Sequence, residues 1–319
     1  TTRTLHSMAW AGSFLANTFA FSTAFKLWNV AFQQYPEGSD ASLWIFVMWF
    51  LLLPEPQFVK GKTRTLSTAE VKGIVWRPIP KLVALSMMLS LLTTSTQDLH
   101  GEDKYKPWLL RFMVPFLPTQ GETIVQQVWN GFLHLWWLYL FVSSLLELSV
   151  IASLPLTGCQ AMEHCFRNPL VESRSLAEFW GSRWNLPVHR LLQRTVYVPM
   201  RKQGYSPAPA VLGTFLVSGL LHEYNFWTHN YVAYHQFGIA TLFFLGMGLG
   251  MLLEHSILTK LASNNSGEPP SKHGIPTLFI ALGYTLLSAI PVERYFIKSW
   301  LEAGMIESVA PLFPHVTCR

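Results

Sequence analysis

The sequence predicts an all-α membrane protein, a polytopic bundle of about seven to nine transmembrane helices with amphipathic helices at the interface. Half of the 319 residues are hydrophobic and 13% are charged, whereas a soluble domain of this size carries about 25% charged residues. Trp is frequent, at 13 residues, and Trp favours the membrane–water interface. The apolar residues also gather in long runs, as spans require.

Seven apolar segments approach the roughly 20 residues that a helix needs to cross the bilayer core. They lie at 9–32, 43–58, 79–96, 128–154, 210–228, 236–258 and 275–291. The second is the weakest, because Pro54-Glu55-Pro56 breaks a helix after the apolar run. The apolar stretch from Trp108 to Leu117 is too short to span, and we expect it to be re-entrant or interfacial.

The distribution of positive charge predicts the orientation of these spans. With a cytosolic N-terminus, most Lys and Arg residues fall in cytosolic loops, chiefly 59–78 and 155–209, as the positive-inside rule requires. In the long aromatic-rich segment 155–209, we expect residues 170–200 to form interfacial amphipathic helices with Arg outward and aromatic rings inward. With no internal repeat, residues 1–319 are expected to form one integral-membrane domain.

Charge and cysteine content argue against other classes of protein. The net charge of +5 is explained by the positive-inside bias and by contact with anionic lipid, so no nucleic-acid partner is expected. Cys159, Cys165 and Cys318 are too sparse for a disulfide framework, so free thiols are expected. The first apolar segment is long enough to span, so no cleavable signal peptide is expected.

Several ionisable residues lie inside or near the predicted spans, where an unpaired charge is costly. Lys26, Glu147, Glu254 and His255 are in such positions. For each of the four, the favoured interpretation is a side chain that is paired or that snorkels to the interface.

His222 is a stronger candidate for chemistry, because it lies well inside the span 210–228. A neutral imidazole costs less there than a carboxylate, and it can accept a proton near neutral pH. Ser218 lies one helical turn earlier on the same face, and Gly219 permits close approach of a backbone or an acyl chain. From these residues alone, a catalytic base and a hydrogen-bonded structural histidine are about equally favoured.

Metal and serine-nucleophile sites find little support in the sequence. His222-Glu223 lacks the second His that a zinc-protease helix carries four residues on. His229 and His235 are spaced too widely for the tight histidine boxes of membrane di-iron enzymes. No Gly-x-Ser-x-Gly elbow is present, so no metal site and no serine nucleophile are expected.

A second candidate motif is Phe179-Trp180-Gly181-Ser182-Arg183-Trp184-Asn185. Its two Trp residues, with Arg and Asn beside them, form an aromatic and polar cluster at the predicted membrane edge. An interfacial aromatic belt is the simpler interpretation. The polar residues Arg183 and Asn185 favour a binding role over a plain belt.

These two motifs resemble those of the membrane-bound O-acyltransferase superfamily, and most closely those of its wax synthase branch. That branch has a similar Phe-Trp-Gly-x-x-Trp-Asn stretch and a similar Ser-Gly-x-x-His-Glu stretch, here Ser218 to Glu223. Phe25-Lys26-Leu27 resembles a further piece of the branch. Ser182 departs from the pattern, because plant members usually carry Arg there, and this leaves the acceptor less defined than the chemistry.

The resemblance implies an acyltransferase in which His222 is the catalytic base and Asn185 assists. It implies acyl-CoA as co-substrate with no other cofactor, a lipid alcohol and membrane lipids as partners, and location in the endoplasmic reticulum membrane. We expect a substrate tunnel that includes Ser218, Gly219 and Glu223, although Glu223 is better suited to pairing with another helix than to catalysis. The residues expected to bind acyl-CoA are Phe179, Trp180, Arg183, Trp184, Arg190, Arg194, Tyr197 and Arg201, with Lys202 beside them.

The leading functional hypothesis is synthesis of a wax ester from acyl-CoA and a long-chain fatty alcohol. The same chemistry on a sterol, a terpenoid or diacylglycerol is the alternative, since the sequence does not fix the length of the tunnel. A lipid or small-molecule transporter is an alternative from another class, and scattered charges within the spans would suit it. A catalytically inactive lipid-binding relative is a third hypothesis, which the presence of both His222 and Asn185 disfavours.

Overall fold

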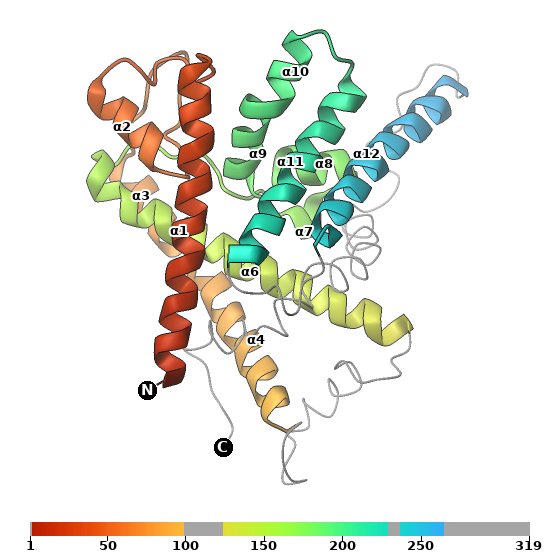
Figure 1. Cartoon of the computed structure of the whole chain (residues 1–319). Coiled ribbons are helices and arrows are strands. Elements are labelled where there is room, and N and C mark those ends of the chain that lie inside the picture. The colour runs from red at the N-terminus through yellow and green to blue at the C-terminus, as the bar shows by residue number, and fades with distance from the viewer. Residues whose placement is uncertain (1, 99–123, 229–236, 265–319) are drawn as a thin grey trace.

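The computed structural model describes residues 2–98, 124–228 and 237–264, and this part of the chain is helical with no strand (Figure 1). Five long helices dominate it: α1 (Thr2–Ala31), α4 (Ile79–Asp98), α6 (Ile124–Thr157), α11 (Pro207–Thr228) and α12 (Ile239–Asn264). The shorter helices are α2 (Leu43–Leu51), α3 (Thr68–Trp76), α7 (Pro169–Glu172), α8 (Leu176–Glu178), α9 (Leu186–Leu192) and α10 (Val198–Lys202). Two π-helical turns, η2 (Phe179–Arg183) and η3 (Gln193–Tyr197), interrupt the short helices.

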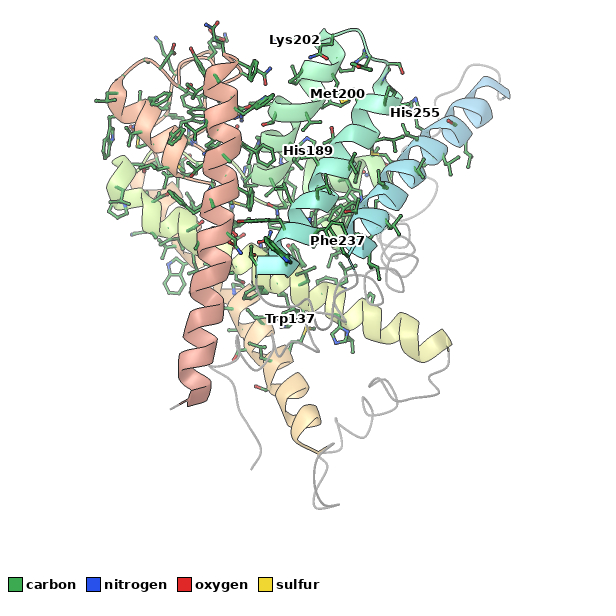
Figure 2. The ribbon with its side chains drawn as sticks, in the orientation of Figure 1. Trp137, His189, Met200, Lys202, Phe237 and His255 are labelled. Carbon is green, nitrogen blue, oxygen red and sulfur yellow. The ribbon has the colours of Figure 1, made fainter. Side chains whose placement is uncertain are left out.

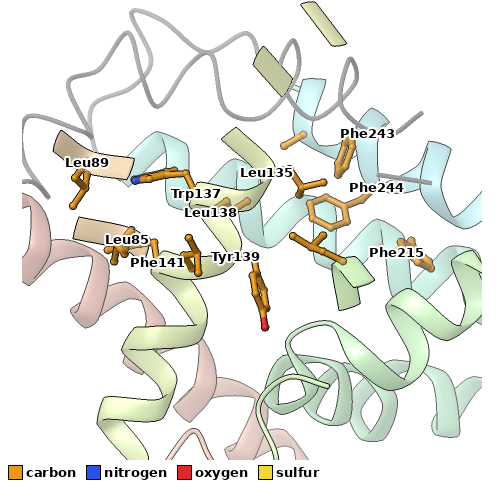
Figure 3. Packing of buried hydrophobic residues seen from close by; sticks show 13 residues of the cluster. Leu85, Leu89, Leu135, Trp137, Leu138, Tyr139, Phe141, Phe215, Phe243 and Phe244 are labelled. Atoms are coloured by element: carbon orange, nitrogen blue, oxygen red, sulfur yellow. The ribbon is translucent and has the colours of Figure 1, made fainter. Parts of the chain in front are cut away.

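Figure 1 shows α1 at one side of the molecule, α11 and α12 side by side at the other, and α6 crossing beneath them. The buried core gathers where α6 meets α4, α11 and α12 (Figure 3). Trp137 and Phe141 of α6 stack with ring centroids 5.5 Å apart, and Phe243 and Phe244 of α12 close the other end of the core. The core therefore ties the helices that flank the candidate site.

Four of the predicted spans correspond closely to long helices of the structure, and a fifth, 9–32, to most of α1. Two helices, over Phe132–Thr157 and Ile239–Ile257, are apolar and long enough to cross a membrane when the described residues are searched. The count of seven to nine spans stays a prediction.

The predicted span at 43–58 is wrong. Helix α2 ends at Leu51, and its 9 residues cover only about 14 Å at 1.5 Å per residue. The chain beyond it is irregular, and Pro56 forms an isolated antiparallel bridge with Met162. The predicted span 275–291, the apolar stretch 108–117 and Cys318 lie outside the described residues.

The segment 170–200 forms short helices and π-helical turns, so its predicted helical character is confirmed. Its aromatic rings point inward, since Phe179, Trp180 and Trp184 pack against the core. The expectation that Arg side chains point outward is wrong for Arg190 and Arg194, whose side chains are only 20% and 19% exposed. Both guanidinium groups pair with carboxylates instead of facing water.

Lys26, Glu147 and Glu254 are paired, as expected for charged residues in predicted spans. Glu147 of α6 accepts a hydrogen bond of 2.7 Å from Lys81 of α4. Glu254 of α12 accepts from the backbone N–H of Leu176, 2.8 Å away, and thereby caps the start of α8. Lys26 is fully buried and lies 3.8 Å from a carboxylate oxygen of Glu55. His255 is exposed.

Candidate functional site

A mostly apolar cavity of about 900 Å³ lies within the described part of the molecule. Its walls come from α1, the chain after α2, α6, η2 with α9, α11 and α12. Both predicted catalytic residues, His222 and Asn185, line it. The two sequence motifs, which lie on different elements, therefore meet at one cavity.

The geometry of His222 fixes the position of its ring proton. Nδ1 lies 2.7 Å from the backbone carbonyl oxygen of Ser218, one turn earlier on α11. A carbonyl can only accept, so Nδ1 must carry the proton and the lone pair falls on Nε2. The imidazole also stacks on Phe244 of α12 at a centroid distance of 4.3 Å. The ring is thus oriented by its own helix and backed by an aromatic ring.

Asn185 lies in an unusual backbone conformation between η2 and α9. Its φ of 39° and ψ of 59° are in the left-handed region, which Asn tolerates better than most residues. The side-chain oxygen Oδ1 is buried and has no hydrogen-bond partner among the described residues. A buried acceptor without a donor costs about 1–3 kcal/mol. A substrate N–H or O–H group could satisfy this oxygen.

Aromatic rings of the second motif form one wall of the cavity. Phe179 and Trp184 stack with centroids 5.3 Å apart, and Trp180 contacts Phe215 of α11 and Phe244 of α12 edge-on, each at 5.9 Å. The indole Nε1 of Trp180 is buried with no partner in the part of the chain that the structure describes. The π-helical turn brings these rings to one side, so an apolar chain could lie along them.

Arg183 was expected to bind acyl-CoA, but its guanidinium is engaged within the motif itself. It pairs with Glu178 and Glu172, in both cases at 2.6 Å, and donates to the backbone carbonyl of Arg167 at 2.9 Å. Arg183 does not line the cavity. These contacts fold the loop back on itself and fix the motif's shape.

Arg190 and Arg194 are likewise engaged by carboxylates. Arg190 lies 2.5 Å from Glu163, and burial lowers the pKa of its guanidinium while it raises the pKa of the Glu163 carboxyl. Arg194 makes a two-pronged contact with Glu55. Arg201 and Lys202 remain exposed at the end of α10, where Figure 2 labels Lys202. Within this set they are therefore the cations most accessible to a soluble phosphate.

Two of the three residues expected in the substrate tunnel face elsewhere. Ser218 lines the cavity. Gly219 faces α12, because a Cβ atom built there would lie 2.6 Å from the Cα of Thr241. Glu223 is buried and accepts a hydrogen bond of 2.9 Å from the backbone N–H of Thr241. Gly219 and Glu223 therefore do not line this cavity, whereas the expectation that Glu223 pairs with another helix is confirmed.

Sequence reasoning missed several polar residues of the cavity, notably His189 on α9 (Figure 2). His189 lies one helical turn after Asn185, so the same spacing that was applied to Ser218 and His222 could have found it. Burial, reinforced by Arg190, lowers the pKa of this imidazole below its ordinary value. Tyr197, which was predicted, also lines the cavity, as do Gln193 and Ser22.

The next expectations concern free cysteine thiols and metal-binding histidines. Cys159 and Cys165 are free thiols, and burial raises the pKa of Cys165 to about 12. Among the described residues, no group of three or more His, Cys, Asp or Glu side chains could hold a metal ion. His229 and His235 lie outside that part of the chain.

The sequence of this site is similar to that of known proteins. Residues 162–246 match the model of the membrane bound O-acyl transferase family, and this range contains both motifs. Probable long-chain-alcohol O-fatty-acyltransferase 7 of Arabidopsis thaliana is 36% identical over 102 residues, 30% of either chain. Number 6 of that series is 32% identical over 188 residues, 55% of this chain and 53% of the relative. Acyl-CoA--sterol O-acyltransferase 1 of the same plant is 42% identical over 72 residues, 21% of either chain.

The matched segment is thus similar to the membrane-bound O-acyltransferase family over residues 162–246. The long-chain-alcohol relatives confirm the resemblance to the wax synthase branch. The alignments span between about a fifth and about half of the length of these curated relatives.

Proposed function

We propose that the chain is an acyl-CoA-dependent O-acyltransferase that joins a fatty acyl group to a long-chain alcohol and forms a wax ester. The observation that carries the proposal is the meeting of His222 and Asn185 at one mostly apolar cavity. An apolar cavity of about 900 Å³ is large enough for two alkyl chains, because ligand cavities of ~300–1,000 Å³ take drug-sized molecules.

The first step of the proposed reaction is removal of the alcohol proton. An alcohol is a weak nucleophile, so a base must take its proton as it attacks. The Nε2 lone pair of His222 serves this purpose, since Nδ1 is committed to the Ser218 carbonyl. The apolar walls exclude water, which would otherwise hydrolyse the thioester.

The alkoxide oxygen then bonds to the thioester carbonyl carbon, and the carbonyl oxygen becomes an oxyanion. The Asn185 amide N–H is the candidate donor to this oxyanion, while its unpaired Oδ1 can accept from an amide N–H of the donor's pantetheine arm. The intermediate collapses as the carbon–sulfur bond breaks. The leaving CoA thiolate takes the proton from the His222 imidazolium, so the products are ester and free CoA.

The two substrates would approach from different directions in this scheme. The exposed Arg201 and Lys202 could hold the CoA phosphates at the cytosolic side, because phosphate favours such cations. Phe179, Trp180, Trp184 and Tyr197 line the cavity and would contact the acyl group. The alcohol would come from the lipid phase, in keeping with residence in the endoplasmic reticulum membrane, and no cofactor beyond acyl-CoA takes part.

Ester formation by the purified protein in detergent tests the proposal. Labelled palmitoyl-CoA is offered with a panel of fatty alcohols, a sterol, a terpenoid alcohol and diacylglycerol, and His222→Ala is assayed in parallel. We expect wax ester from the parent and a loss of about 100- to 10,000-fold in the variant, the range for a general base. Elution as a single species on gel filtration establishes that the variant is folded.

Other results would redirect the proposal. Ester formed with the sterol or diacylglycerol alone would keep the chemistry and replace the acceptor. Undiminished ester from a folded His222→Ala would remove His222 from its role. Saturable uptake into proteoliposomes, with no ester from any pair of substrates, would favour a transporter instead.

A further inference from the structure

A cluster of buried charges lies directly behind one wall of the cavity, and the proposed chemistry makes no use of it. Its centre is Glu55, in the irregular chain between α2 and α3, with a side chain that is 3% exposed. Lys26 of α1 is 0% exposed, and Arg194 of η3 is 19% exposed. The three side chains thus join segments that are far apart in the sequence.

The contacts of Glu55 use both of its carboxylate oxygens. Oε1 accepts from Arg194 Nη1 at 3.0 Å, and Oε2 accepts from Arg194 Nη2 at 2.5 Å. The Nζ of Lys26 lies 3.8 Å from Oε1 and also donates to the backbone carbonyls of Trp49 and Leu52. Lys26 therefore caps the end of α2, where carbonyls lack helical partners, and it compensates the charge of Glu55.

A neutral contact runs beside this cluster and joins the same elements. Thr195 of η3 donates to the side-chain oxygen of Asn29 on α1 at 3.1 Å, and both residues are buried. Two adjacent residues of η3 thus make polar contacts: Thr195 with α1, and Arg194 with Glu55 in the chain after α2. Such buried contacts are directional, so they fix the relative positions of α1 and η3 more narrowly than apolar packing does.

Each charged residue of the cluster is a near neighbour of a residue that lines the cavity. Ser22 lies one turn before Lys26 on α1, Pro54 precedes Glu55, and Gln193 precedes Arg194. The cluster itself does not line the cavity. It is placed to hold the wall formed by α1, the chain after α2, and η3 from behind.

We propose that Glu55 is a positioning and specificity-determining residue, which sets the width of the cavity between α1 and η3 and so the chain lengths that the enzyme accepts. This inference rests on the proposed function, because it concerns the same cavity. Removal of the carboxylate leaves Lys26 and Arg194 as neighbouring buried cations without their partner. Their repulsion would push α1 and η3 apart.

The test compares ester yields across a series of acyl-CoA and alcohol chain lengths. Glu55→Gln removes the charge, Glu55→Asp retains it, and Glu70→Gln removes a carboxylate from the exposed Arg64 pair as a control. Rates are expressed per molecule of folded, monodisperse protein. We expect Glu55→Gln to lose about 100-fold in kcat/KM on the parent's preferred pair, since a displacement of ~1 Å costs about that much. Longer chains should lose less, and Glu55→Asp should restore the parent profile.

A second measurement is independent of catalysis. Spin labels are attached at Phe32→Cys after α1 and Gln203→Cys after α10, with Cys159, Cys165 and Cys318 replaced by Ser. Both label sites are exposed. We expect Glu55→Gln to lengthen or broaden the distance distribution between the labels, and Glu70→Gln to leave it unchanged.

The two measurements separate this inference from the proposed function. A parent that makes no ester contradicts the proposed function, and the spin-label distances then still report on Glu55. A folded Glu55→Gln with the parent's chain-length profile, or with the parent's distance distribution, overturns the positioning role.

Discussion

Among the described residues, some polar groups are unpaired on the side of the cavity proposed for the reaction, whereas charged groups are paired in the structure behind the cavity wall. On the reaction side, Asn185 Oδ1 and Trp180 Nε1 are buried with no partner among the described residues, and Asn185 has a left-handed backbone. Behind the wall, Glu55 and Arg194 use their charged groups in paired contacts. The unpaired buried groups cost free energy that a hydrogen bond from a substrate can offset. The paired groups instead hold the helices and loops in place.

The same contrast divides the faces of one helix. On α11, Ser218 and His222 face the cavity, while Gly219 and Glu223 face α12. The state of pairing therefore separates the residues proposed for chemistry from those proposed for support better than their charge does. By this criterion we infer a supporting role for Arg183, Arg190 and Arg194, which were expected to bind CoA.

The largest effect that would sharpen this comparison is expected at Asn185. Asn185→Gly removes the amide but tolerates the backbone φ of 39°. We expect kcat to fall by about 100- to 1,000-fold, the usual cost of losing an oxyanion donor, with little change in the thermal unfolding midpoint. Single-turnover assays and thermal unfolding in detergent measure the two quantities.

Asn185→Ala provides the control for backbone conformation. Ala is strained at this φ, so it should lose the same activity and be less stable than the Gly variant. Full activity in Asn185→Gly would show that the Asn185 side-chain amide has no catalytic part, and would contradict the comparison between the two sides of the cavity.

The next effect concerns the supporting face of α11. Gly219→Ala places a methyl group 2.6 Å from the backbone of Thr241, which should destabilise the protein by about 1–3 kcal/mol, the range for overpacking. Gly246→Ala on α12 is the matched control, since a Cβ there meets nothing within 4 Å. Thermal unfolding that is equal for the two variants would contradict the close approach of α11 and α12.

A smaller effect distinguishes a structural role of Arg183 from a role in binding acyl-CoA. Arg183→Met should cost about 1.5–3 kcal/mol of stability through lost hydrogen bonds to charged groups, yet leave the KM for acyl-CoA unchanged in the protein that remains folded. Arg201→Gln is expected to do the reverse, raising KM without lowering the unfolding midpoint. A higher KM in Arg183→Met alone would return Arg183 to the binding site.

The smallest effect is a pH dependence of stability from His189. Its pKa in the folded protein is lowered by burial and by Arg190, so the unfolded state binds the proton more tightly. The stabilisation is fully present above the ordinary value of 6.5 and is lost as the pH falls toward the lowered pKa, by at most about 1.4 kcal/mol per pH unit.

Thermal unfolding at pH 7.5 and at pH 5.5 checks the dependence on His189. His189→Gln should reduce the difference between the two midpoints. His164, whose pKa is also lowered by burial, should account for part of what remains. A parent protein with equal midpoints at both pH values would contradict the expected burial of His189.

The long helices could be predicted from the sequence, and His222 and Asn185 could be singled out, because hydropathy and short motifs are local signals. Pairing partners were beyond it: Arg194 meets Glu55 across 139 positions of the chain, and Glu254 caps α8 from 78 positions away. Such contacts depend on tertiary packing. The span at 43–58 failed because its apolar run was counted through Pro54, although the helix ends at Leu51.

The group that orients the His222 ring is a main-chain carbonyl, that of Ser218. Every amino acid at position 218 supplies the same oxygen as long as the helix persists, so the orienting partner cannot be lost by an ordinary substitution. A search for a carboxylate that steers this imidazole would overlook it. Mutational tolerance at position 218 would therefore reflect only the space beside the substrate, and only local unwinding of α11 would turn the base away.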